Sequence, residues 1–180
     1  MAVNVDAYQK VKSLLDEKGV TLVAVSKLQP VERILELYNL GQRDFGENYV
    51  QELVDKEAKL PKDIRWHFIG HLQSNKVKYI ASFVHLIHGV DSFKLLKEIN
   101  KQGEKANRKI NVLLQMHIAQ EETKFGLDEK ELKELLQSTQ KEPLPHVEIK
   151  GLMGMASFTE NKAQVESEFK NLKKYFEEGK

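Results

Sequence analysis

Short apolar segments alternate along the chain with longer segments whose apolar residues recur at helical spacing. The first helical segment places Ala7, Val11, Leu14 and Leu15 on one face, and Gly19 follows it as a terminator. Six apolar segments of strand length come next, at residues 21–25, 42–45, 64–69, 83–87, 111–118 and 147–155. Each of them is followed by a segment with helical spacing. The pattern predicts one leading helix and then six strand–helix units.

The connections between these units favour a parallel sheet. No two predicted strands are close enough for a hairpin, and a helix between consecutive strands is the usual connection of parallel neighbours. The units span about 20 to 35 residues, which fits a (β/α) TIM-type barrel or a doubly wound α/β sheet. No G-x-G-x-x-G motif follows any strand, and its absence favours the barrel.

The length of the chain limits how much of a barrel it can form. A closed eight-stranded barrel usually needs about 250 residues, and at least about 200. This chain has 180 residues and stops after its sixth unit. No linker, low-complexity segment or second domain interrupts it. We therefore expect a single domain over residues 1–180, in which the last strands of the barrel are missing or the sheet is open.

Composition excludes several classes of function. The 28 basic and 27 acidic residues nearly cancel, and no long block of one charge suggests binding to nucleic acid or to a membrane surface. The chain has no cysteine, which excludes disulfides and thiolate metal sites. The longest apolar stretches are about six residues, far short of a membrane span. The N-terminus lacks the pattern of a secretory signal, so we expect a cytoplasmic protein.

Polar side chains with possible chemistry gather where the predicted strands end. Lys27 closes an apolar strand that we expect to be buried on both faces, and Asn48, His67 and Lys124 lie at the ends of later strands. A lysine amine attacks a carbonyl group only when it is neutral, and burial beside a second cation such as Lys124 or Lys76 favours that form. The residues indicate Schiff-base chemistry, with pyridoxal phosphate or a sugar-type aldehyde as the partner.

Each of these candidates also has a purely structural interpretation. Lys27 can be a solvated lysine after a strand, and Asn48 can cap the next helix together with Gln51. His67 lies between Trp66 and Phe68, which is typical of a buried histidine with satisfied hydrogen bonds. The further candidates Met153 and Met155 can fill gaps in the core. The histidine pairs lack the helical spacing of a metalloprotease motif, so we expect no metal site.

Four longer motifs carry a resemblance to a known family. Residues 24–27, 45–52, 66–76 and 151–153 read AVSK, FGENYVQE, WHFIGHLQSNK and GLM. In this order and spacing they resemble the pyridoxal 5′-phosphate (PLP) homeostasis protein family. The resemblance covers essentially the whole chain. It implies a single-domain barrel similar to the N-terminal domain of alanine racemase, and PLP binding without established catalytic activity.

The resemblance also implies roles for six residues. Lys27 would hold PLP as an aldimine, and Asn48 would approach the cofactor from the second strand end. His67 and Met153 or Met155 would lie beside the ring, and Lys124 matches a lysine close to the site. The family continues with Ser-Met-Gly-Met-Ser and Val-Arg-Ile-Gly segments that hold the phosphate and the pyridine nitrogen. Neither is present here, so we expect a C-terminally incomplete chain with weak or no PLP binding and lower stability than a complete relative.

Three functions remain open at this point, and we favour the first. The chain is expected to hold PLP and to buffer it or pass it to PLP-dependent apo-enzymes, as a monomer without catalytic residues. The second function is a PLP-dependent racemase or decarboxylase of the alanine racemase fold, which by resemblance needs a tyrosine from a second domain. The third is a cofactor-free aldolase that forms a Schiff base at Lys27.

Overall fold

A computed structural model describes residues 3–119 and 125–179 of the chain. Six parallel strands form one sheet in the order of the sequence. They are β1 Ala24–Val25, β2 Asp44–Glu47, β3 Arg65–Phe68, β4 Leu86–Val90, β5 Ile110–Met116 and β6 Val147–Gly154. The helices are α1 Val5–Asp16, α2 Val31–Asn39, α3 Val50–Lys59, α4 Val77–Ile80 after a 3₁₀ turn at Ser74–Lys76, α5 Phe93–Lys105, α6 Glu129–Lys141 and α7 Lys162–Glu178.

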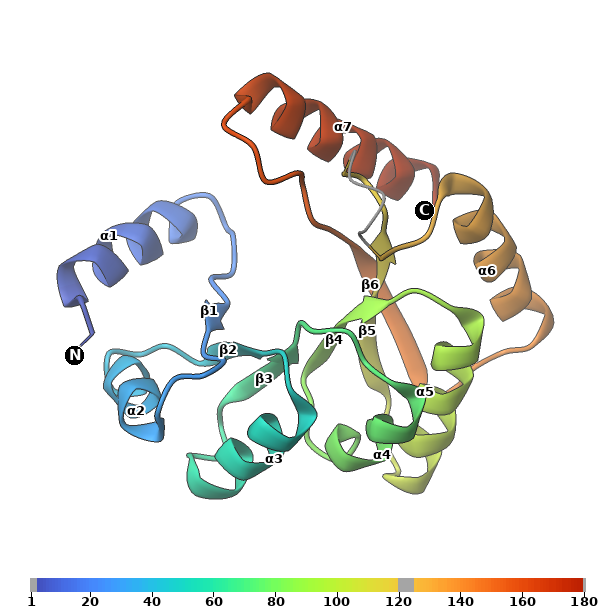
Figure 1. Cartoon of the computed structure of the whole chain (residues 1–180). Coiled ribbons are helices and arrows are strands. Elements are labelled where there is room, and N and C mark those ends of the chain that lie inside the picture. Colours follow the sequence, from blue (N-terminus) through green and yellow to red (C-terminus); the bar gives the residue numbers. More distant parts are fainter. Residues whose placement is uncertain (1–2, 120–124, 180) are drawn as a thin grey trace.

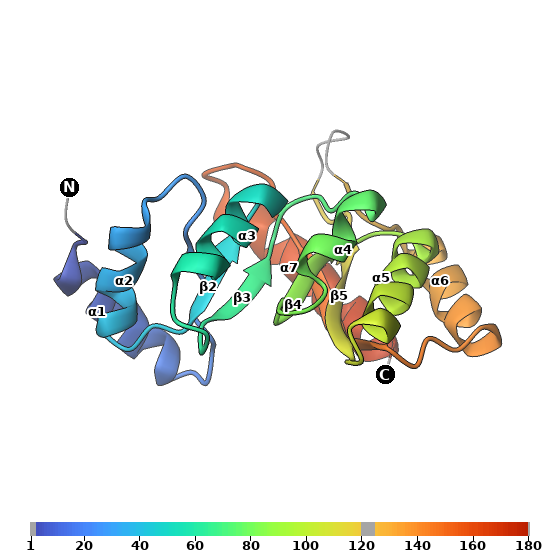
Figure 2. The ribbon, with the colours of Figure 1, turned by 90° about the horizontal axis from the view of Figure 1, so that it is seen from below.

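The sheet curves as part of a barrel. Figure 1 shows the strands bending around a central space, with α2 to α6 on the outside and with β1 and β6 at the two ends of the sheet. Seen from below in Figure 2, α3, α4 and α5 lie side by side along the outer surface. The predicted parallel strand–helix array and its barrel-type curvature are therefore confirmed. None of the described helices has the length and apolar character that a membrane crossing requires.

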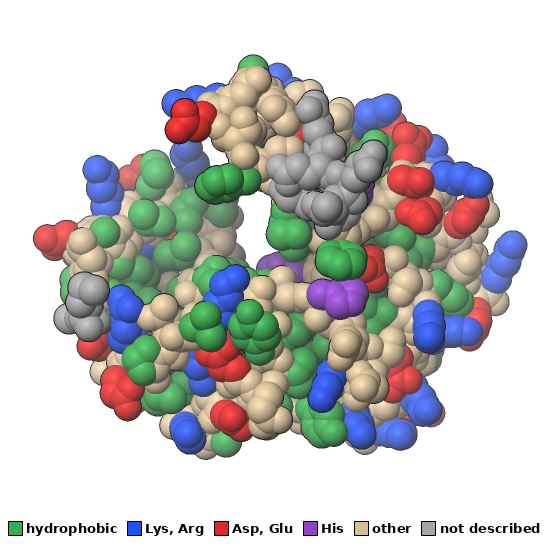
Figure 3. Space-filling view, viewed as in Figure 1, with side chains coloured by type: hydrophobic (Ala, Val, Ile, Leu, Met, Phe, Trp, Pro, Cys, Tyr) green, Lys and Arg blue, Asp and Glu red, His purple; other side chains and the backbone are tan. Residues whose placement is uncertain are grey.

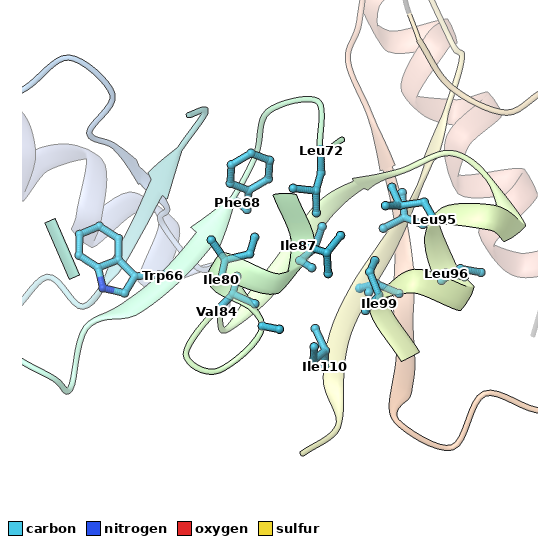
Figure 4. Packing of buried hydrophobic residues seen from close by; sticks show 14 of the residues in the cluster. Trp66, Phe68, Leu72, Ile80, Val84, Ile87, Leu95, Leu96, Ile99 and Ile110 are labelled. Atoms are coloured by element: carbon cyan, nitrogen blue, oxygen red, sulfur yellow. The ribbon is translucent and has the colours of Figure 1, made fainter. Parts of the chain in front are cut away.

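The hydrophobic core lies between the outer face of the sheet and the helices. Successive side chains of a strand point to opposite faces, and Phe45, Trp66, Phe68, Ile87 and Leu114 all face outward. Each of them is at most 2% exposed. Figure 4 shows the same layer continuing through Leu72, in the loop after β3, and into α4 and α5 through Ile80, Leu95, Leu96 and Ile99. This layer holds the six strand ends in a fixed arrangement.

The inner face of the sheet carries a group of polar side chains on β2, β3 and β4. Asp44 pairs in register with Arg65, and Gly46 pairs with His67, so these residues share the inner face with His88. Figure 3 shows an opening at the centre of the molecule with histidine side chains beside it. TIM-type barrels usually fill this space with branched apolar residues. These polar side chains make the centre of the fold a candidate ligand-binding site.

One expectation about the first strand is wrong. The segment before Lys27 was expected to be buried on both faces, but β1 has only two residues and Val25 is 55% exposed. The cause is its position at the end of the sheet, where β2 is the only strand that pairs with it in the described part of the chain. The apolar run signalled a strand correctly, but it could not indicate whether a second neighbour would be present.

Candidate functional site

The carboxyl ends of β1 and β2 place Lys27 and Asn48 at the same level of the sheet. Val25 pairs with Gly46, and the Ser26 N–H donates to the Gly46 carbonyl at 2.9 Å. Lys27 and Asn48 each lie two residues beyond that pair. Neighbouring strands are about 4.8 Å apart, so the two residues start from adjacent positions. This juxtaposition is what the order of the strand ends in the sequence predicts.

Lys27 lies in a tight turn and its side chain is exposed. The turn covers residues 26–29 and is closed by the Gln29 N–H, which donates to the Ser26 carbonyl at 3.0 Å. Within the described ranges, the Lys27 amine makes no hydrogen bond and no ion pair. The expected burial of this lysine is wrong for the same reason as the burial of β1, which lies at the end of the sheet. The amine is therefore accessible to a ligand.

Asn48 does not cap the following helix, so the capping interpretation is wrong. Helix α3 begins at Val50, and Tyr49 occupies the cap position without a side-chain hydrogen bond. The Asn48 Oδ1 is buried and finds no hydrogen-bond partner among the residues that the structure describes. A buried acceptor without a donor costs about 1–3 kcal/mol. The Asn48 amide oxygen is thus a candidate acceptor for a ligand hydrogen bond.

Gly70 allows the end of β3 to approach Asn48 closely. A Cβ atom at Gly70 would lie 2.3 Å from the Asn48 carbonyl oxygen and 2.8 Å from its Cα atom. No side chain fits at that separation, because the atoms in the way belong to the backbone. The lack of a side chain at Gly70 therefore permits the ends of β2 and β3 to lie this close together.

His67 lies on the inner face with both ring nitrogens engaged. Its Nε2 is 3.0 Å from Asp44 Oδ1, and its Nδ1 is 2.8 Å from His88 Nε2. Arg65 donates to Asp44 at 2.7 Å from Nε. Burial acts to raise the pKa of Asp44, but its hydrogen bonds to Arg65 and His67 hold that pKa below the usual value. This is the satisfied buried histidine that the sequence suggested.

Burial keeps the imidazoles of this group neutral. It lowers the pKa of His67 against the opposing effect of Asp44. Burial, followed by the charges of His67 and His85, lowers the pKa of His88 from 6.5 to about 4. A neutral pair can share one hydrogen bond, with one ring donating and the other accepting. The imidazoles of His67 and His88 are therefore uncharged near neutral pH, and they line the inner face.

The ligand atoms of Asp44, His67 and His85 lie within 4.8 Å of one another, which is close enough for a metal ion. The carboxylate of Asp44 is already held by Arg65 and His67. A metal ion would have to displace the Arg65 guanidinium and break both bonds. We assign no metal to this group, and the expectation of a metal-free protein stays a prediction.

Two of the three remaining candidates come from the other end of the sheet. Met153 lies in β6, where it pairs with Gln115 of β5, and Met155 follows the strand and is 45% exposed. β6 is at the opposite end of the sheet from β1. Lys124 falls outside the described residues. The structure thus groups Lys27, Asn48 and His67 on neighbouring strands, and the cofactor roles of all six candidates stay predictions.

A buried charged network under the Lys27 turn was not predicted from the sequence. The Lys56 ammonium of α3 donates to Glu47 Oε1, to Glu52 Oε1 and to the Ser26 carbonyl, each at 2.7 Å. Glu47 is fully buried, and burial raises the pKa of its carboxyl group against the opposing effects of Lys56 and Ser26. The one clue in the sequence was the spacing of four residues between Glu52 and Lys56.

Comparisons with known proteins identify the family to which this sequence and fold are similar. The model of the family described as "Alanine racemase, N-terminal domain" matches residues 5–180. A pyridoxal phosphate homeostasis protein from Aquifex aeolicus is 42% identical over 163 residues, which cover 90% of this chain and 71% of that protein. A protein of the same name from Pasteurella multocida is 38% identical over 167 residues and covers 90% and 70%.

Solved structures show the same similarity. PipY of Synechococcus elongatus without PLP is 33% identical with a TM-score of 0.86, over 95% of this chain and 80% of that one. The structure of PipY with PLP bound gives a TM-score of 0.83 over the same shares. An alanine racemase from Streptomyces lavendulae has a TM-score of 0.71 at 15% identity, over 88% and 44% of the two chains, and so shares the fold alone.

Proposed function

Because the chain belongs to the pyridoxal phosphate homeostasis protein family, we propose that it binds PLP and helps to maintain the supply of this cofactor. The observation that carries the proposal is that Lys27 and Asn48 follow neighbouring strand ends. Among the described residues, the exposed Lys27 amine makes no polar contact and the buried Asn48 Oδ1 accepts no hydrogen bond. A relative of the same fold, PipY, is known with PLP bound. An accessible amine is the group that an aldehyde engages, and an unused acceptor can take a hydrogen bond from an O–H or N–H group of the same ligand.

Lys27, Asn48 and His67 would each contribute a different interaction to the binding of PLP. PLP supplies an aldehyde, and the Lys27 amine is the nucleophile that the chain offers to it. The Asn48 Oδ1 accepts a hydrogen bond from a donor on the ligand, which satisfies the buried oxygen. His67 makes no further polar contact, because Asp44 and His88 occupy its two nitrogens. It orders the wall of the inner face on which the ligand would rest.

We propose a carrier function rather than an enzymatic one. A racemase or decarboxylase needs a second acid or base beside the lysine. His67 is poorly suited to that task, because burial disfavours its protonation and both nitrogens are in use. PLP-dependent apo-enzymes are the proposed recipients of the cofactor. The monomeric state and the cytoplasmic location expected from the sequence stay predictions.

A titration with PLP tests the proposal. Added PLP should produce a visible absorption band with the wild-type chain that is absent in Lys27→Ala. Lys101→Ala, which removes an exposed lysine from α5, is the matched control and should keep the band. A band of full intensity in Lys27→Ala would overturn the assignment of Lys27.

An amino-acid racemisation assay separates the carrier from the enzyme. The wild-type chain loaded with PLP should show no turnover above that of free PLP. Turnover at rates of about 1–1,000 per second, which are ordinary for enzymes, would favour the racemase alternative.

A further inference from the structure

Helix α3 holds the two peptide groups that flank Lys27. On one side, the Ser26 carbonyl accepts a hydrogen bond from Lys56 Nζ at 2.7 Å. On the other side, the Leu28 N–H donates to Glu52 Oε1 at 2.6 Å. The backbone on both sides of the reactive lysine is therefore fixed by two residues that lie one helical turn apart.

The two residues belong to a network with no spare donor. Lys56 is 5% exposed, and its three ammonium protons point to Ser26, Glu47 and Glu52. Glu47 Oε1 also accepts from the Ser26 hydroxyl at 2.6 Å. The network therefore joins the end of β1, the end of β2 and α3 into one unit. Bonds between charged groups of this kind are short and directional, so they fix geometry well.

The turn itself needs such support because its backbone is strained. Leu28 has a φ of +59°, which lies in the left-handed region that disfavours residues with a side chain. Its side chain is 77% exposed, so packing of that side chain does not hold the conformation. The hydrogen bond from the Leu28 N–H to Glu52 holds it, together with the bond from the Gln29 N–H to the Ser26 carbonyl that closes the turn.

We propose that Glu52 and Lys56 are positioning residues, which fix the turn at residues 26–29 so that the Lys27 amine is presented to the aldehyde of PLP. Neither residue touches the cofactor in this account. Fixing the backbone beforehand removes part of the entropy loss that bond formation would otherwise require. The inference rests on the proposed function and deepens it, because it names the groups that control Lys27.

A set of three variants tests this proposal. Glu52→Ala removes the acceptor of the Leu28 N–H, whereas Glu52→Gln keeps an oxygen at that position. Glu57→Ala is the matched control, since it removes an acid of α3 that pairs with the exposed Lys62 instead. For each variant we would measure the PLP titration curve and its dependence on pH. Circular dichroism and hydrogen exchange at Leu28 would check the fold and the turn.

The expected results follow from the contacts. Glu52→Ala should weaken PLP binding about tenfold and speed up hydrogen exchange at Leu28, with an unchanged overall fold. Glu52→Gln should recover most of the affinity, and Glu57→Ala should match the wild type. Wild-type affinity in Glu52→Ala, or equal losses in Glu52→Ala and Glu57→Ala, would overturn this inference alone. If the wild type itself shows no band that depends on Lys27, the proposed function fails and the inference fails with it.

Discussion

At the scale of single residues, the site pairs a free amine with a fully engaged one. Lys27 is exposed and makes no polar contact with the described residues, whereas Lys56 is buried and uses all three of its donors. The first arrangement leaves an amine free to react, and the second fixes the backbone that carries it. The two lysines are 29 positions apart in the sequence, and Lys56 reaches the backbone beside Lys27 through the Ser26 carbonyl and through Glu52.

The strained turn gives a prediction at this scale. Leu28→Gly should raise the free energy of unfolding by about 0.5–1 kcal/mol, because glycine adopts a positive φ without steric penalty. Little burial is lost, since the leucine is exposed. Leu28→Ala should change stability much less, because alanine meets the same penalty in the left-handed region. Urea denaturation of the three proteins measures both changes, and a loss of stability in Leu28→Gly would contradict the account.

The sequence predicted which single residues are candidates for the site from their chemical type and their position near strand ends. Lys27, Asn48 and His67 stood out because parallel strands end at one edge of a sheet, and the structure does bring them onto neighbouring strands. Their contacts could not be predicted. The bonds of His67 to Asp44 and His88 depend on the register of three strands, which no local pattern specifies.

At the scale of elements, α3 does more than cover the sheet. Its side chains reach past its own strand, β2, to the turn after β1. Glu52 and Lys56 are four residues apart and so project from one face of the helix. The helix therefore sets the relative position of two strand ends that carry candidate site residues.

Removal of the central cation of this network should be costly. Lys56→Met should lower the free energy of unfolding by about 3–5 kcal/mol, because it leaves two buried or half-buried carboxylates without their partner. Lys62→Met removes the exposed end of a surface pair between Glu57 of α3 and Lys62, which follows that helix, and should change stability by less than about 1 kcal/mol. Thermal and chemical unfolding of both variants make the comparison. Equal effects in the two would show that the network adds nothing beyond a surface pair.

The elements themselves were largely predictable, and their boundaries were not. Hydrophobic periodicity gave the number, order and parallel direction of the strands, because strand–helix alternation allows few other topologies. The strand expected at 83–87 runs instead from Leu86 to Val90. Asn48 was assigned as a possible cap because its residue type favours caps, but the chain turns one residue later and Tyr49 takes that position. Which residue caps a helix depends on where the chain leaves the strand and the helix begins, and residue type alone does not specify that point.

At the scale of the whole molecule, the barrel segment separates an apolar outer layer from a polar inner face. The outer layer gives stability, and the inner face carries buried titratable groups at Asp44 and His67 and a half-buried one at His88. Such groups tie the stability of the fold to pH. The direction of that dependence follows from the direction of each pKa shift.

Acid should destabilise the chain through His88. Its pKa is about 4 in the folded state and 6.5 in the unfolded state, so the unfolded chain takes up the proton first. The stability that His88 contributes above pH 6.5 is therefore lost as the pH falls toward 4, by about 3 kcal/mol at most. The raised pKa of Glu47 acts in the opposite direction, because its contribution is lost as the pH rises.

A variant isolates the contribution of His88. In His88→Gln, the free energy of unfolding should fall less than in the wild type between pH 6.5 and 4, because glutamine does not titrate. Urea denaturation at several pH values measures the two curves. Parallel curves for the two proteins would show that protonation of His88 does not control acid stability.

The most direct test of the central claim is to find which lysine reacts with PLP. The chain would be incubated with PLP, reduced with borohydride and digested, and the modified peptides would be identified by mass spectrometry. The reduced adduct should lie predominantly on Lys27, and Lys27→Ala should abolish it. An adduct spread evenly over exposed lysines such as Lys101, with Lys27 unmodified, would contradict the account.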